Sequence, residues 1–167
     1  QTRATNAKGQ TTRYEYDDLN RLVTVTDPLS GTYHYSYDAA GNLLQISNPQ
    51  SQIVSYAYDE LGRQIKVTDP LSGTISYAYD ANGNLLRETD QAGRATTYTY
   101  DAFNQLPSMT DPLSGTNTYG YDQVGNQVRF TDANNHTTTY VYDGLDRLIE
   151  VRDPFSNTIV YTYDANG

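Results

Sequence analysis

YAYDANGNLL, the stretch from Tyr77 to Leu86, recurs in varied form along the whole chain. Its second tyrosine, which aspartate follows, returns every 21 residues and eight times in all, and a partner tyrosine stands two residues before it each time. A strict period of about 20–50 residues is typical of repeat architectures. Residues 1–167 are therefore predicted to form a single array of nearly eight units. The sixteen tyrosines of this predicted structural ladder are Tyr14, Tyr16, Tyr35, Tyr37, Tyr56, Tyr58, Tyr77, Tyr79, Tyr98, Tyr100, Tyr119, Tyr121, Tyr140, Tyr142, Tyr161 and Tyr163.

The composition of the chain disfavours several classes of function. There is no cysteine, so neither a disulfide nor a thiolate metal site can form. The net charge is -9, but most aspartates stand at recurring turns, where their carboxylates accept hydrogen bonds from backbone amides. The 11 lysines and arginines are scattered, which argues against nucleic acid as a partner. No window approaches the roughly 18 apolar residues of a membrane span.

One unit contains two predicted strands and two predicted turns. Residues 74–79, TISYAY, are rich in β-branched and aromatic residues and alternate between two faces, which favours a strand. A five-residue connection follows at residues 80–84, then a second strand at residues 85–89 and a turn from Asp90 to Gly93. Because 21 residues leave no room for a helix, the fold class is all-β. It is expected to be a continuous antiparallel sheet of tandem β-hairpins.

The turn after each Tyr-Asp pair is expected to need a left-handed backbone. The fourth residue after the ladder tyrosine is always glycine, asparagine or aspartate, the residues that accept a positive φ most readily. The next residue is always polar, as at Arg21, and is expected to be exposed. The turn residues predicted in the units that carry glycine are Asp38, Gly41, Asp59, Gly62, Asp80, Gly83, Asp122 and Gly125.

The second turn of the unit shows a longer period of 42 residues. DPLSG begins at Asp27, Asp69 and Asp111 and DPFSN at Asp153, so the array is a series of paired hairpins. Proline is expected to preset the first corner of a type I turn, with glycine or asparagine closing it. In the alternate turns the flexible residue stands one place earlier, at Gly9, Ser51, Gly93 and Asn135. The apolar residues at the DPLSG and DPFSN tips indicate either local packing, which we favour, or a contact row for a neighbouring layer or chain: Leu29, Leu71, Leu113 and Phe155.

The two faces of the predicted sheet differ in polarity. Apolar residues alternate along the second strand of the unit, as at Val23 and Val25, and hairpin pairing can align them with the tyrosines. This face is predicted to look inward, and Glu88 is an exception on it. Pro107 occupies a strand position and should force a bulge or a break. Because a flat single sheet covers little of its apolar surface, the sheet is expected to curl on itself or to meet further polypeptide.

The pattern YxYDxxGNL or YxYDxxGRL, with an interposed DPxG turn, resembles the YD repeat of Rhs proteins, bacterial Tc-toxin components and teneurins. The resemblance extends over essentially the whole chain. It implies a spiralling antiparallel sheet that forms a shell, in large members around a C-terminal toxin or other cargo. The self-cleavage motif of Rhs shells is of the DPxGL type, whereas DPLSG here has an extra residue before glycine and threonine after it. No catalytic aspartate is assigned on this resemblance.

No residue pattern in the chain predicts a catalytic, cofactor or metal site. The two histidines, His34 and His136, have no serine or aspartate at a related spacing, which disfavours a hydrolytic triad. DANGN at Asp80 begins like a calcium loop, but Leu85 and Gln91 stand where such a loop needs glycine and glutamate. We therefore expect a protein without enzymatic activity and without a cofactor.

Three functions are consistent with the sequence. The leading one is a structural scaffold, the wall of a shell, tube or extracellular fibre, whose partners are further repeats or other copies. The second is a segment of an Rhs-type shell that encloses a toxin polypeptide. The third is a carbohydrate-binding module at the cell surface, because spaced aromatic rings can stack on sugars. We expect a secreted or cell-surface bacterial location, and we expect the chain to be part of a longer protein because its repeats would continue in phase.

Overall fold

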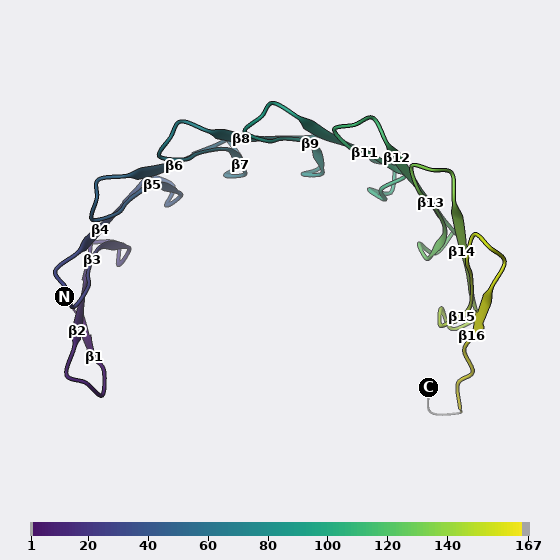
Figure 1. Cartoon of the computed structure of the whole chain (residues 1–167), viewed down its shortest axis with the longest axis horizontal. Helices are drawn as coiled ribbons and strands as arrows, with labels where there is room; N and C mark the ends of the chain where they lie inside the picture. The colour runs from purple at the N-terminus through teal and green to yellow at the C-terminus, as the bar shows by residue number, and fades with distance from the viewer. Residues whose placement is uncertain (1, 165–167) are drawn as a thin grey trace. The chain divides into compact units, whose positions relative to one another are not determined.

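The computed structural model describes residues 2–164, and in that range every regular element is a β-strand. The strands follow one another in the sheet in chain order, and neighbours such as β1 and β2 or β14 and β15 pair antiparallel (Figure 1). The all-β prediction is therefore confirmed. The strands are β1 (Thr2–Thr5), β2 (Thr11–Tyr16), β3 (Leu22–Thr26), β4 (Thr32–Tyr37), β5 (Leu43–Ser47), β6 (Ile53–Tyr58), β7 (Gln64–Thr68), β8 (Thr74–Tyr79), β9 (Leu85–Thr89), β10 (Ala95–Thr99), β11 (Ser108–Thr110), β12 (Thr116–Tyr121), β13 (Gln127–Thr131), β14 (Thr137–Tyr142), β15 (Leu148–Arg152) and β16 (Thr158–Val160).

Contacts divide the chain into two compact units, Gln1–Tyr77 and Ala78–Gly167. In the first unit, Val25 of β3 lies opposite Tyr14 of β2 on one side and Tyr33 of β4 on the other. In the second unit, Tyr119 lies opposite Phe130 in the same way, with the two ring centroids 5.3 Å apart. Each unit therefore has one face of tyrosine, aliphatic and other aromatic side chains, as the alternation predicts. We call this the tyrosine face.

A β-bulge accompanies the second ladder tyrosine in most hairpins. Between β2 and β3 the register slips after Glu15: Glu15 pairs with Thr24, but Tyr16 pairs with Leu22, so Val23 is left out of the ladder. Such an extra residue bends a strand and increases its local twist. The alternation of residues along the strands does not predict this bulge. It recurs at Tyr37, Tyr58, Tyr121 and Tyr142.

Pro107 breaks the ladder, as predicted. Strand β11 has only three residues, whereas the equivalent strands β3 and β13 have five, because pairing with β10 begins only at Ser108. Proline has no N–H to donate, so the first part of this strand cannot pair with β10. The Pro107 carbonyl still accepts a hydrogen bond from the Tyr119 amide at 2.9 Å.

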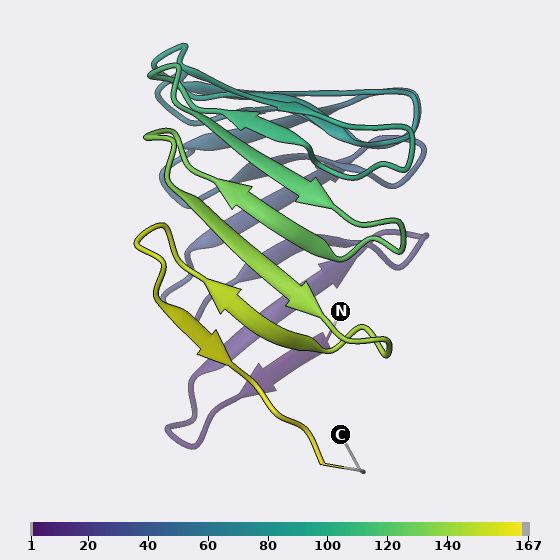
Figure 2. The same ribbon diagram turned by 90° about the vertical axis from the view of Figure 1, so that its right-hand side faces the viewer.

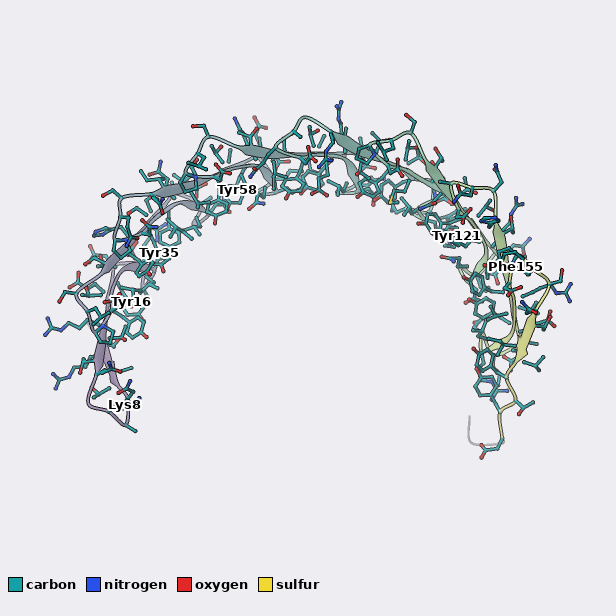
Figure 3. The ribbon with its side chains drawn as sticks, viewed as in Figure 1. Lys8, Tyr16, Tyr35, Tyr58, Tyr121 and Phe155 are labelled. Carbon is teal, nitrogen blue, oxygen red and sulfur yellow. The ribbon has the colours of Figure 1, made fainter. Side chains whose placement is uncertain are left out.

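No side chain of the described residues is buried, so each unit lacks a closed core. The tyrosine face is half-buried, and Figure 3 shows the labelled Tyr35 and Tyr58 on the inner side of the bend of the first unit. Figure 3 shows Tyr121 on the inner side of the bend of the second unit. The sheet is therefore stabilised by neighbour-to-neighbour contacts, and one apolar face remains partly open to solvent.

Candidate functional site

The corners of the array share one hydrogen-bond frame. At Asp17, the backbone amide donates to the Arg21 carbonyl at 3.0 Å, and the Asn20 amide donates back to the Asp17 carbonyl at 3.0 Å. The Asp17 carboxylate oxygen Oδ1 also accepts from the Leu19 and Arg21 amides, at 3.0 and 2.9 Å. Both backbone bonds recur at every corner from Asn6 to Asp153. The Tyr-Asp corners and the second corners are therefore the same structure with different residues.

Figure 2 shows that the corners lie at opposite ends of the strands. We call one row, whose corners begin at Asp17, Asp38, Asp59, Asp80, Asp101, Asp122 and Asp143, the Tyr-Asp edge. We call the other row, whose corners begin at Asn6, Asp27, Asn48, Asp69, Asp90, Asp111, Asp132 and Asp153, the second edge.

The fourth residue of each corner has a positive φ at both edges. At the Tyr-Asp edge the prediction is confirmed, with φ 60° at Asn20, 95° at Gly41 and 94° at Gly83. At the second edge the glycine of the DPLSG corners is not the left-handed residue. Their positive φ of 69° belongs to the serine at Ser30, Ser72 and Ser114, and the glycine that follows is not left-handed. The left-handed residue is therefore the fourth corner residue in both the DPLSG corners and the alternate corners.

The glycine of DPLSG is required for space. A Cβ atom on Gly31 would lie 2.6 Å from Asp27 Oδ2 and 2.9 Å from Pro49 Cγ of the next corner on the same edge. A Cβ atom on Gly115 would likewise lie 2.7 Å from Asp111 Oδ2 and 3.0 Å from Ala133 Cβ. Neighbouring corners of the second edge are thus held together by close packing.

Neighbouring hairpins at the Tyr-Asp edge are held together by hydrogen bonds. The Tyr37 hydroxyl donates to the Leu22 carbonyl of the preceding hairpin at 2.9 Å, next to the bulge residue Val23. The repeat pattern predicts that the tyrosines belong to the ladder, but it does not predict this hydrogen bond. The same bond is made by Tyr58 to Leu43 (3.0 Å), Tyr121 to Leu106 (3.1 Å), Tyr142 to Gln127 (3.1 Å) and Tyr163 to Leu148 (2.7 Å).

The fifth corner residue of the Tyr-Asp edge also bridges to the next hairpin. Arg21 donates from Nε to Asp17 Oδ2 at 2.7 Å and from Nη1 to the Asp38 carbonyl at 2.9 Å. Its guanidinium carbon lies 4.9 Å from the centre of the Tyr37 ring. Where this residue is Asn84, the amide donates to Asn104 of the next corner at 2.8 Å. The prediction that this position is simply exposed is therefore wrong, because both side chains are half-buried by these contacts.

Hydrogen bonds favour the ionised form of several corner carboxylates. The backbone amide of Arg21 lowers the pKa of Asp17, and the side chain of Asn42 lowers the pKa of Asp38. The Arg147 side chain lowers the pKa of Asp143 in the same way. Hydrogen bonds to a carboxylate favour the charged form, so these shifts indicate turn chemistry.

Both edges project apolar side chains into solvent. At the second edge, Leu29, Leu71 and Leu113 are 88, 89 and 90% exposed and Phe155 is 78% exposed, so the local packing that we favoured from the sequence is wrong. A matching row at the Tyr-Asp edge was not predicted, although it recurs in the sequence as the third residue after the ladder tyrosine. That row contains Leu19, Leu61, Phe103, Val124 and Leu145.

The structure gathers no constellation for catalysis or metal binding among residues 2–164. No group of three or more histidine, aspartate and glutamate side chains could hold a metal ion in that range. His136 contacts Asp132 in its own corner at 3.1 Å, and His34 lies opposite Thr24 and Ser47 on the polar face. In the part of the chain that is described, no helix is long and apolar enough to cross a membrane.

Glu88 is an acidic exception on the tyrosine face. It lies opposite Thr96, at the position that Val25 occupies in β3, and it is half-buried. Burial raises the pKa of Tyr98, and the Glu88 charge raises it further. The tyrosine face therefore carries one carboxylate among its rings.

Two family models match the chain, and both describe proteins built from this kind of repeat. A model described as the Teneurin YD-shell matches residues 1–93, and one described as the RHS Repeat matches residues 79–116, 121–158 and 142–167. The chain belongs to the RHS/YD-repeat family. A search of curated protein sequences found no match.

The YD-repeat array is similar in fold to solved Tc-toxin structures. A TcdB2-TccC3-Cdc42 crystal structure matches 89% of this chain with a TM-score of 0.69 and 18% identity. A Photorhabdus luminescens Tc holotoxin pore matches 89% with a TM-score of 0.68, and a TcdB2-TccC3 crystal structure matches 87% with a TM-score of 0.68, both at 18% identity. The chain spans 9% of the length of each of these proteins.

Proposed function

We propose that the array is a non-enzymatic structural scaffold, a segment of the wall of a larger YD-repeat assembly whose tyrosine face lies against further polypeptide. The single observation that carries this proposal is the absence of any buried side chain in residues 2–164. A sheet of this size usually needs one apolar face covered to be stable. Here that face is half-buried and carries most of the aromatic side chains.

The arrangement of contacts supports a mechanical role. Hydrogen bonds join neighbouring hairpins at the Tyr-Asp edge within each unit, as from Arg21 to Asp38 and from Tyr37 to Leu22. These bonds repeat along the array without converging on any one point, which suits a wall better than a catalytic centre. The partners proposed are further repeats of the same chain or other copies of it, in a secreted or cell-surface bacterial protein.

A shell that encloses a cargo polypeptide is the alternative form of this wall. The likeness to Tc-toxin structures, together with the Teneurin YD-shell match, favours this alternative over an open fibre. A cargo domain encoded downstream in the complete reading frame would support the closed shell. Long uninterrupted repeats with ordered polymers in electron micrographs would support the tube or fibre.

Chemical labelling tests whether the tyrosine face is covered. The 167-residue chain and the whole protein from which it comes are treated with tetranitromethane, and nitration is followed by mass spectrometry. Tyr35, Tyr56 and Tyr119 are expected to react at least about tenfold more slowly in the whole protein, because their rings would be covered there. Tyrosines that react at equal rates in both proteins would overturn the proposal.

Acetylation of Lys66 provides the matched control. Its side chain is exposed on the opposite face of the sheet, so acetic anhydride should modify it at the same rate in both proteins. If Lys66 is protected in the whole protein and the tyrosines are not, then the polar face is the covered one. The proposed orientation of the wall would then be wrong.

A further inference from the structure

A groove lies between two neighbouring corners of the Tyr-Asp edge in the second unit. Its volume is about 540 Å³, within the range of about 300–1,000 Å³ that is usual for ligand pockets. One side comes from the corner that begins at Asp101, and the other comes from the corner that begins at Asp122. The aromatic rings of Phe103 and Tyr121 line the groove, and none of its lining residues is a lysine or an arginine.

Between the first two corners of the same edge, the equivalent place is filled by an arginine of the chain itself. Arg21 donates to Asp17 Oδ2 at 2.7 Å and to the Asp38 carbonyl at 2.9 Å. Its guanidinium carbon lies 4.9 Å from the centre of the Tyr37 ring. Arg147 makes the same carboxylate and ring contacts in the second unit. A carboxylate, a carbonyl and a ring therefore hold a guanidinium group at this edge.

The Asp101 corner has these three groups but lacks the arginine. Gln105 takes its place, and its Nε2 would lie 3.2 Å from a Cβ atom on Gly125, so the amide extends toward the next corner. At the other six corners of this edge the fifth residue donates to Oδ2 of the corner aspartate. Of the corners that the described residues form at this edge, only the Asp101 corner leaves Oδ2 without a side-chain donor. The Tyr121 ring and Asp122 line the same groove.

A second aromatic ring distinguishes this groove from the corners that hold an arginine. Phe103 is the third corner residue and is 82% exposed, although the corner frame uses only its amide, which donates to Asp101 Oδ1 at 2.8 Å. The arginine corners carry leucine at the same position, namely Leu19, Leu61 and Leu145. A guanidinium group is planar and weakly hydrated and stacks on aromatic faces. Phe103 therefore adds a stacking surface where the chain supplies no cation.

We propose that the groove at the Asp101 corner binds the guanidinium group of an arginine side chain from a partner polypeptide. The group donates to Asp101 Oδ2 and to the Asp122 carbonyl and stacks on the Tyr121 ring, while Phe103 contacts its other side. The contacts of Arg21 select this occupant, because they use the same three groups of the edge. A lysine ammonium is a point charge without the planar fork, so it cannot reproduce them. The proposal does not depend on what covers the tyrosine face.

A titration of the whole chain with N-acetyl-arginine amide, followed in amide NMR spectra, tests this site. Saturable shifts are expected at the amides of Phe103, Gln105 and Asp122. The amides of Leu19 and Arg21 should not shift, because their corner already holds its own arginine. N-acetyl-lysine amide should bind at least about threefold more weakly. Shifts spread evenly over all corners, or equal binding of the two amides, would show general attraction to an acidic chain and would overturn the proposal.

Two substitutions of one residue separate an occupied site from an altered one. Gln105→Arg supplies the missing arginine within the chain and should weaken the apparent Kd for N-acetyl-arginine amide at least about tenfold. Gln105→Ala removes the same side chain but leaves the site empty, so its Kd should stay within about twofold of that of the unaltered chain. Equal affinities of the two variants would contradict the proposal.

Asp101→Asn tests the carboxylate while keeping the turn. Its Oδ1 can still accept the two corner amides, as Asn48 does at its own corner, but the charge is lost, and binding should weaken at least about tenfold. The matched control Asp18→Asn removes an exposed acid beside another corner and should leave the Kd unchanged. Equal effects of the two substitutions would rule out a site at Asp101. If the amide spectrum shows that Asp101→Asn does not fold, Phe103→Leu replaces it, with an expected weakening of about threefold.

Discussion

The Tyr-Asp edge and the second edge are built on one corner frame, yet they join neighbouring hairpins by different physical means. At the Tyr-Asp edge, side chains reach across to backbone carbonyls, as Arg21 does to Asp38 and Tyr37 to Leu22. At the second edge, the corners approach so closely that Gly31 has no room for a Cβ atom beside Pro49. Residue choice at a corner therefore depends on the neighbouring corner as well as on the turn itself.

This difference predicts which substitutions each edge tolerates. A change at the Tyr-Asp edge should act through lost hydrogen bonds and lost packing against the bulge. A change at the second edge should be harmless at the exposed tip and costly at the crowded glycine. Each of the three predictions below compares the two edges, and each is measured by urea unfolding at low protein concentration.

The largest effect is expected at the tyrosine that spans two hairpins. Tyr142→Ala should lower the free energy of unfolding by about 3 kcal/mol, because it removes a half-buried ring and its bond to the Gln127 carbonyl. Tyr142→Phe should cost about 1 kcal/mol, since only the hydrogen bond is lost. Leu29→Ala, at an exposed tip of the second edge, should change it by less than about 0.5 kcal/mol. Equal effects of Leu29→Ala and Tyr142→Ala would contradict the comparison.

An intermediate effect is expected at two glycines that serve different purposes. Gly115→Ala at the second edge should cost about 2 kcal/mol through crowding against Asp111 and Ala133. Gly83→Ala at the Tyr-Asp edge should cost about 1 kcal/mol, because its φ is 94° although nothing lies near its Cβ position. Gly83→Asn should be nearly neutral, since asparagine accepts a positive φ and occupies the same corner position at Asn20. If Gly83→Asn costs as much as Gly83→Ala, strain is not the cause.

The smallest effect concerns acid. The folded-state pKa of Asp143 lies below its usual value of 3.8, so its contribution to stability is complete above that pH and is lost as the pH falls through the folded value. Asp143→Asn should therefore make the urea midpoint fall slightly less between pH 5 and about pH 3. Asn48 already performs the corner role as an amide at the second edge, accepting from the Gln50 and Gln52 amides. Asn48→Asp should add acid sensitivity, and a midpoint that responds to neither change would contradict the assignment.

Much of the fold follows from the repeat because each unit must satisfy the same local chemistry. The all-β class, the hairpin order, the pairing of the tyrosines with Val25 and its equivalents, and the left-handed residue at Gly83 could all be predicted. The repeat period, the alternation and the turn residues predict contacts between residues that are close in the sequence. The break at Pro107 could also be predicted, because proline has no N–H to donate to a neighbouring strand.

The features that escaped prediction depend on the neighbouring hairpin. The bulge at Val23 lies next to Leu22, whose carbonyl accepts the Tyr37 hydroxyl bond, and alternation alone does not reveal it. Gly31 is needed because Pro49 of the next corner leaves no room for a Cβ atom. Leu29 is exposed because no other part of the described chain packs over this tip. A comparison of the third corner residue across all units would have found the tips at Leu19 and Leu61, because their period is visible in the sequence.

The strictly sequential pairing of strands has a consequence for how the chain acquires its structure. Each strand contacts the strand before it and the strand after it in the chain, so partners such as Arg13 and Thr26 are separated by little intervening sequence. Short separations make loop closure fast, and an isolated β-hairpin forms in about 1–10 μs. A polypeptide that emerges from a ribosome or a narrow conduit could therefore add one hairpin at a time to a growing template. Folding of such an array does not require pairing between segments that are far apart in the sequence.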